Sequence, residues 1–118
     1  DYIDARREME DLRARADHAF ADVDLLLTPT TMIPPIEISA GSQDPPLPPE
    51  GTPIEFRNTH MFDVLGLPAI SVPCGFTRDG LPIGLQIAGP RFGEARVLAL
   101  AHAYKRITDW HWRLPPLT

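Results

Sequence analysis

The amino-acid sequence predicts an α/β fold in which helices pack on a small mixed sheet. Two segments, near the start and the end of the chain, carry apolar residues at the three- and four-residue spacing of an amphipathic helix. Three short apolar runs lie between them, and an Asp-Gly turn separates the last two runs, as in a hairpin. The chain has 118 residues, so we expect one compact domain over residues 1–118.

The first half of the chain predicts a helix, a strand and a long loop. A helix over residues 2–21 would have one apolar face and one charged face, and the charged face is expected to be solvated. The apolar run Val23–Leu27 predicts a buried strand. Eight of the 14 prolines then lie within residues 29–53, where regular structure is not expected. This proline-rich loop is either a crossing loop that packs against another part of a longer protein or a mobile linker.

The middle of the chain predicts a short helix followed by the hairpin. The helix is expected over Ile54–Leu65, because Gly66-Leu67-Pro68 is typical of a helix stop. Ala69–Pro73 and Ile83–Ala88 are the two predicted strands. The turn between them contains Asp79-Gly80, a pair that favours two consecutive positive φ angles, so the strands should be antiparallel.

The last predicted helix, Gly93–Ile107, carries a clear apolar stripe, and residues 109–118 form a tail that contains both tryptophans. A sheet of three strands should keep at least one open edge. A longer protein would cover that edge, whereas the chain alone could pair it with a second copy, so we expect self-association. The chain begins with Asp1 rather than methionine, which suggests a piece of a longer protein.

Composition limits the classes of function. The formal net charge of -5 argues against a general nucleic-acid-binding surface. The single cysteine, Cys74, can form neither an internal disulfide nor a cysteine metal cage, so a cytoplasmic protein is the simplest interpretation. No apolar run is long enough to cross a bilayer, so no membrane association is expected.

The sequence predicts no catalytic, metal or cofactor site. The four histidines do not have the spacing of a helical zinc motif, and the nucleophile-elbow and phosphate-loop motifs are missing. Ser71 would need Lys105, the single lysine, as its base, and we expect that this pair does not form. Cys74 could act as a nucleophile only if His60 approached it, and an inert, half-buried thiol is the expected alternative.

Short motifs from Gly66 to Trp110 resemble the C-terminal segment of the amidase signature family. They are, in order, Gly-Leu-Pro-Ala, Ser-Val-Pro, Gly-Leu-Pro, Gly-Leu-Gln, Gly89 and Glu94. The segment DLLLTPTT, from Asp24 to Thr31, is similar to a strand and a Pro-Thr loop of the same family. Most of the shared residues are glycines, prolines and apolar residues that shape a backbone, so the resemblance indicates a fold more strongly than a substrate.

The resemblance implies catalysis by a serine nucleophile, a second serine in a cis peptide and a lysine base, carried by a Gly/Ser-rich signature and a segment before it. This sequence contains neither, so we expect a C-terminal fragment that is inactive alone. Thr59, His60 and Asp63 are candidates for the wall of a substrate pocket. Many family members have Asn at the position of Asp63, which here either changes polar contacts in the pocket or caps a helix.

Three functions remain open. The parent protein could be an amidase that hydrolyses a small or aryl carboxamide, and the proline-rich insertion slightly favours this. It could be the A subunit of a tRNA-dependent Glu/Asp amidotransferase, which releases ammonia from glutamine and works with partner subunits and tRNA. The chain could also be an independent interaction domain that is not an enzyme. In the first two cases its main partner is the rest of the parent chain.

Overall fold

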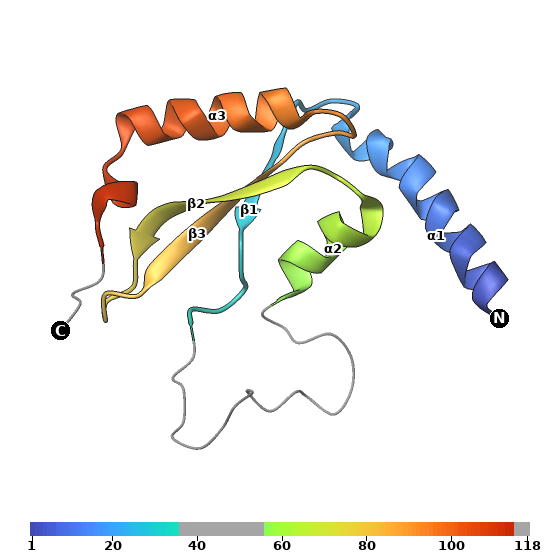
Figure 1. The fold of residues 1–118 in the computed structure, drawn as a ribbon, viewed down its shortest axis with the longest axis horizontal. Helices are drawn as coiled ribbons and strands as arrows, with labels where there is room; N and C mark the ends of the chain where they lie inside the picture. The colour runs from blue at the N-terminus through green and yellow to red at the C-terminus, as the bar shows by residue number, and fades with distance from the viewer. Residues whose placement is uncertain (36–55, 115–118) are drawn as a thin grey trace, which may run out of the picture.

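The computed structural model of the chain describes residues 1–35 and 56–114, in which a small sheet carries helices on both sides (Figure 1). The helices are α1 (Tyr2–Ala16), α2 (Arg57–Leu65) and α3 (Glu94–Ile107), the strands are β1 (Leu26–Pro29), β2 (Ala69–Phe76) and β3 (Pro82–Ala88), and short 3-10 helices span Asp17–Phe20 and Trp110–Trp112. The order of the elements is the one that the sequence predicts.

β3 lies in the middle of the sheet, between β1 and β2. Both of its pairings are antiparallel. The predicted layers, helices packed on a small sheet, are therefore confirmed, but the expectation of a mixed sheet is wrong for the described strands. β1 and β2 run in the same direction, and because β3 separates them, these three strands form no parallel pair.

The hairpin between β2 and β3 forms as predicted, but with a different turn. Gly80 has a φ of +80°, but Asp79 does not have a positive φ, because Phe92 is the one described residue other than glycine that has one. The Gly80 N–H donates to the Thr77 carbonyl at 3.1 Å, and the Thr77 N–H donates to the Leu81 carbonyl at 2.8 Å. The turn is therefore a three-residue loop that ends in one left-handed glycine.

Several boundaries differ from the predicted ones. α1 ends at Ala16, where the chain continues into the first 3-10 helix, and β1 begins at Leu26 instead of Val23. β2 continues past Pro73 because an irregularity in its register allows it to bend and keep pairing with β3. The predicted start of α2 and the proline-rich loop beyond residue 35 lie outside the described residues.

The sheet face under α3, which we call the α3 face, is apolar. It is formed by alternate strand residues, which are Ile70, Val72, Leu85 and Ile87. Val97 and Ala101 of α3 pack on Val72 and Ile87, and the Ile87 side chain is completely buried. Figure 1 shows α3 along one side of the strands and α2 on the other.

The opposite side of the sheet, the α2 face, is apolar only at one end. There Phe62 of α2 is buried in a cluster with Ala88 of β3 and Ala16 of α1. Gly66 ends α2 with a φ of +68°, and its N–H lies 3.2 Å from the Asp63 carbonyl. The predicted helix stop is thereby confirmed, and the positive φ explains why a glycine stands there.

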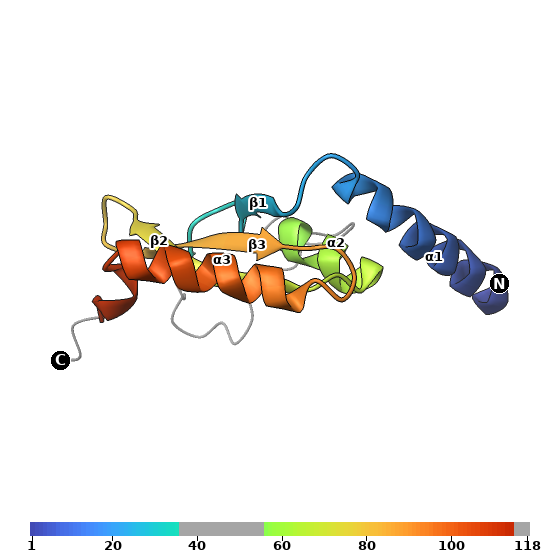
Figure 2. The ribbon, with the colours of Figure 1, turned by 90° about the horizontal axis from the view of Figure 1, so that it is seen from above.

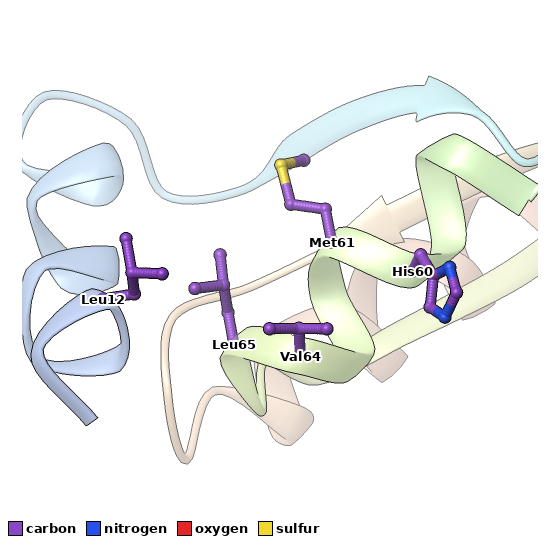
Figure 3. Close-up of a pocket in the computed structure, with 5 residues that line it drawn as sticks. All are labelled: Leu12, His60, Met61, Val64 and Leu65. Carbon is purple, nitrogen blue, oxygen red and sulfur yellow. The ribbon is translucent and has the colours of Figure 1, made fainter. Parts of the chain in front are cut away.

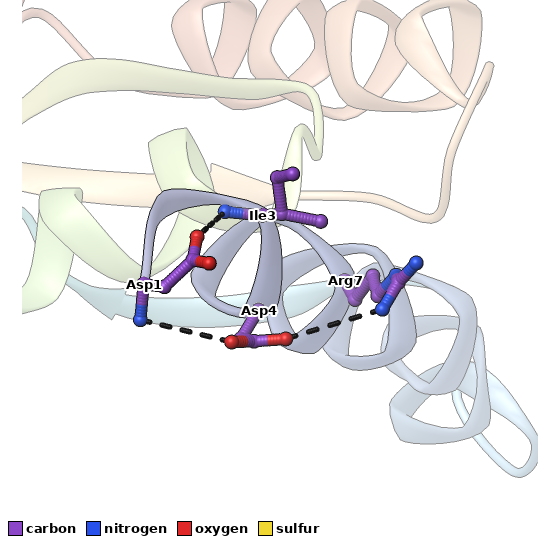
Figure 4. Close-up of polar contacts among 4 residues, drawn as sticks. All are labelled: Asp1, Ile3, Asp4 and Arg7. Carbon is purple, nitrogen blue, oxygen red and sulfur yellow. Dashed lines mark hydrogen bonds and ion pairs between the residues drawn. The ribbon is translucent and has the colours of Figure 1, made fainter.

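α1 projects from the body of the molecule (Figure 2). The carboxylate of Asp1 accepts a hydrogen bond from the Ile3 N–H at 2.8 Å and so caps the helix, and Asp4 lies 3.9 Å from Arg7 (Figure 4). At the other end, the Arg13 Nε donates to the Val64 carbonyl at 2.7 Å. This bond and the Ala16 contact attach the last turns of α1 to α2.

Residues 109–114 of the C-terminal tail fold back on the tip of the hairpin. The Trp110 ring lies 6.1 Å from the Phe76 ring, and the Arg113 guanidinium lies 4.5 Å from the centre of the Trp110 ring. Arg113 also forms an ion pair with Asp109 at 3.0 Å. Stacking on Phe76 therefore holds these residues against the hairpin, and the ion pair, which lies within the tail, holds Arg113 in place.

Candidate functional site

The α2 face carries a group of polar side chains beside its apolar end. We call it the hydroxyl–amide patch, and its members are Thr28, Thr30, Asn58, Ser71 and Gln86. Ser71 of β2 and Thr28 of β1 are both register partners of Gln86 of β3. Side chains that are paired in register point to the same face, so these three form one row across the sheet.

Gln86 is the buried centre of the patch. Its side chain is 4% exposed, which is unusual for a polar residue. Its Nε2 donates to the Thr28 Oγ1 at 3.1 Å and to the Asn58 carbonyl at 3.1 Å. Because a buried amide without partners would destabilise the fold, these two bonds explain how Gln86 is accommodated.

Two hydroxyl groups lie together at the open end of the patch. The Oγ1 of Thr30 and the Oγ of Ser71 are 2.6 Å apart. A Cβ atom at Gly84 would lie 2.6 Å from the first oxygen and 2.7 Å from the second. A side chain at this position would therefore push the hydroxyl pair apart, and glycine is the residue that allows it.

The patch can bind and orient a polar group, but it offers Ser71 no lysine as a base. Ser71 lies on the α2 face, whereas Lys105 belongs to α3, which packs on the other face. The nearest described partner of the Ser71 hydroxyl is the Thr30 hydroxyl, which does not act as a strong base. Hydroxyl and amide groups of this kind form hydrogen bonds with a carbonyl or amide group of a ligand.

A second concave feature lies between α1 and α2. It is an open groove of about 480 Å³, lined by Leu12, His60, Met61, Val64 and Leu65. Leu12 on α1 and Leu65 on α2 face one another across it (Figure 3). The lining is mainly apolar, so the groove is suited to an apolar segment rather than to a polar substrate.

The three predicted pocket residues occupy different parts of α2. Thr59 is half-buried, and its Oγ1 donates to the Phe56 carbonyl at 3.1 Å. His60 is exposed and lines the groove. Asp63 is exposed one turn after Thr59, and its carbonyl, rather than its carboxylate, takes part in the helix cap. Thr59 and Asp63 thus share one side of the helix, whereas His60 lies on the side of the groove.

Cys74 is a half-buried free thiol at the irregularity in β2. Within residues 1–35 and 56–114, no three His, Cys, Asp or Glu side chains gather as a metal ion would require. None of the described helices combines the length and the apolar character needed to cross a bilayer.

Sequence reasoning missed Thr28, Thr30, Asn58 and Gln86 as possible site residues. One signal was present, because Gln86 is a polar residue inside the apolar run Ile83–Ala88. In a strand that is buried on both faces, such a residue needs a hydrogen-bond partner. The two threonines alternate directly after an apolar run in the same way, which places them on one face of a strand.

Comparisons with known proteins identify the family. A family model described as Amidase matches residues 1–98. The chain is 40% identical over 114 residues to the A subunit of Glutamyl-tRNA(Gln) amidotransferase from Pseudomonas syringae pv. syringae, a match that covers 97% of this chain and 23% of that protein.

Two solved structures have a similar fold. A bacterial aryl acylamidase of the amidase signature family has a TM-score of 0.73 and 29% identity, over 88% of this chain and 22% of that one. The A subunit of Glutamyl-tRNA(Gln) amidotransferase from Thermotoga maritima has a TM-score of 0.59 and 27% identity, over 85% of this chain and 21% of that one. The chain thus spans a little over a fifth of the length of these relatives. With residues 1–98 matched by the family model, this chain belongs to the amidase family.

Proposed function

We propose that this chain is the C-terminal part of an enzyme that hydrolyses carboxamides by acyl transfer through a serine. The match of the family model to residues 1–98 carries this proposal. The likeness to an aryl acylamidase supports an amide as the substrate. The chain would supply strands of the parent sheet, the covering helix α3 and part of the pocket wall.

In this proposal, the hydroxyl–amide patch faces the substrate pocket. Ser71 is exposed, Thr30 is half-buried and Gln86 is buried, so the patch opens from the sheet towards its surface at the hydroxyl pair. The two hydroxyls share one hydrogen bond, and one O–H therefore stays free to donate to a carbonyl oxygen. Thr59, which follows Asn58 on α2, and Asp63, one turn later, would extend the wall. His60 would contribute from the side of the groove.

The first experiment compares the isolated chain with the longer parent protein on simple carboxamides. We expect no turnover by the isolated chain, because Ser71 has no lysine base, and turnover by the parent. Matched Ser71→Ala and Cys74→Ala variants of the isolated chain are the controls. Turnover that survives the first substitution and disappears with the second would reveal thiol chemistry and contradict the proposal.

The second candidate function is that of an amidotransferase A subunit. It is favoured by the 40% identity to the Pseudomonas syringae protein over nearly the whole chain. The parent would then release ammonia from glutamine and would need partner subunits and tRNA. Ammonia release from glutamine that depends on added partner subunits, with little turnover of aryl amides, would select this function over the first.

Self-association remains a further prediction for the isolated chain. Its support is the exposure of large apolar side chains, among them Tyr2 at 74% and Ile107 at 82%. Light scattering at high concentration should reveal dimers or larger species, and a uniform monomer would contradict the prediction. The third alternative is an interaction domain that is not an enzyme. It would be supported if neither the parent nor the chain turned over an amide and the chain bound another protein.

We also propose a cytoplasmic location, because the one cysteine of the chain is a free thiol.

A further inference from the structure

We infer that Gln86 is a positioning residue that sets the first turn of α2 on the sheet and so places Thr59 in the pocket wall. The placement of Thr59 in a pocket rests on the proposed function. The attachment of α2 through Gln86 does not, because it follows from contacts within the chain.

Two hydrogen bonds attach the first turn of α2 to two different strands. The Gln86 Nε2 of β3 donates to the Asn58 carbonyl at 3.1 Å, and the Asn58 Nδ2 donates to the Pro29 carbonyl of β1 at 2.8 Å. Asn58 therefore uses its backbone and its side chain at once, and it contacts both strands. Thr59 is the next residue, so its position follows that of Asn58.

The two ends of α2 are held by different kinds of contact. The C-terminal half is anchored by buried Phe62, by the Gly66 cap and by the Arg13 bond to the Val64 carbonyl. Among the residues that the structure describes, no side chain caps the N-terminus of α2 at Phe56. A change at Gln86 should therefore loosen the first turn selectively and leave the rest of the helix in place.

The amide of Gln86 is the group that this geometry requires. Its Nε2 carries two N–H donors, and both acceptors, the Thr28 Oγ1 and the Asn58 carbonyl, lie 3.1 Å away. Thr28 can rotate its hydroxyl to suit a new neighbour, but a carbonyl can only accept. Methionine has a similar length and no donor, so Gln86→Met removes the attachment with little change in volume.

The first test is hydrogen exchange of the backbone amides in the whole chain. The amides of Met61, Phe62 and Asp63 donate to the carbonyls of the first turn of α2, so they report on its order. In Gln86→Met, we expect their exchange to rise up to about tenfold, the upper range of the factor that one ordinary hydrogen bond represents, with α3 unchanged. Val97→Ala, on the α3 face, is the matched control and should raise exchange in α3 instead. Unchanged protection in α2, or an equal rise in α2 and α3, would overturn the inference.

The second test uses the parent protein and separates the inference from the proposed function. If wild type turns over a carboxamide, Gln86→Met should raise KM about tenfold at nearly constant kcat, as expected for a displaced wall. Val97→Ala should leave both constants unchanged below its unfolding temperature. An inactive wild type would refute the proposed function alone, whereas loss of kcat at constant KM in Gln86→Met would refute the positioning role.

Discussion

The two faces of the sheet are built from alternate residues of the same strands, yet they differ in almost every physical respect. The α3 face is apolar throughout and is covered along its length by one amphipathic helix. The α2 face is apolar only near Ala88 and Leu26, and beyond them it carries the hydroxyl–amide patch. The period-2 alternation of a strand allows one sequence to place apolar side chains on one face and polar side chains on the other.

The difference also concerns the kind of free energy involved. Burial of Ile87 under α3 removes apolar surface from water and stabilises the fold directly. Burial of Gln86 contributes little net stability, because its hydrogen bonds mainly offset the loss of hydration. Truncation of a buried side chain on the α3 face should therefore cost more stability than loss of a hydrogen-bonding group on the α2 face, which should act mainly on local order and on binding.

The largest expected effect is that of Ile87→Ala on the α3 face. Loss of this completely buried side chain leaves a cavity between the sheet and α3, and we expect a cost of about 2–5 kcal/mol in the free energy of unfolding. Urea unfolding followed by circular dichroism measures it. Leu27→Ala is a matched control, because Leu27 pairs with Ile87 but is 57% exposed, and it should cost much less. Equal costs in the free energy of unfolding would contradict the expected difference between the buried part of the α3 face and its exposed edge.

A smaller effect is expected from Gly84→Ala on the α2 face. The new methyl group would collide with the hydroxyl pair, and overpacking of this kind costs roughly 1–3 kcal/mol. The same unfolding assay applies. In a Thr30→Ala/Ser71→Ala background both hydroxyl oxygens are gone, so Gly84→Ala should cost less. Additive costs in the two backgrounds would mean that the hydroxyl pair is not what requires glycine.

The smallest expected effect lies outside both faces, in the tail. The hydrogen bond from Arg113 lowers the pKa of the Asp109 carboxyl below its usual value. A lowered pKa in the folded state contributes stability above the unfolded value of about 3.9, and this stability is lost as the pH falls through the folded value. We expect Trp110 fluorescence, measured in a Trp112→Phe variant, to report loosening of the tail below about pH 4, with little change in helix content.

Arg113→Gln provides the control for this acid transition. Without the guanidinium, Asp109 loses the main cause of its lowered pKa, and no ion pair remains for acid to break. The change in Trp110 fluorescence below about pH 4 should therefore be much smaller than in the chain that keeps Arg113. Simultaneous loss of helix content and of the Trp110 signal would show that the tail is part of the main cooperative unit, contrary to the prediction.

Features that depend on neighbouring residues were predictable from the sequence. The apolar stripe of α3, the helix stop at Gly66 and the hairpin around Gly80 each follow from residues only a few positions apart. The type of turn was not predictable in the same way, because Asp-Gly is compatible with a two-residue and a three-residue loop. Which loop forms depends on the register of the strands on either side.

The order of the strands was beyond such reasoning, and the patch depends on it. The three strands were each predicted, but their pairing was left open for β1, which lies far from the hairpin in the sequence. The structure places β1 against β3, so Thr28 meets Gln86 across a separation of 58 residues. Pairing on the other edge of the hairpin would have brought Thr28 next to β2 and left Gln86 without this partner.

The sequence by itself determined the local elements and the likeness to the family. It also showed that the chain has no two adjacent serines and no lysine before Lys105, because each of these features can be read from residue order and count. Only the tertiary structure decided that Ser71 and Lys105 lie on opposite sides of the sheet, and that Thr28, Asn58 and Gln86 form one network. The physical reason is that strand pairing joins distant residues through backbone hydrogen bonds, which every residue type except proline can both donate and accept and which therefore leave little trace in the sequence.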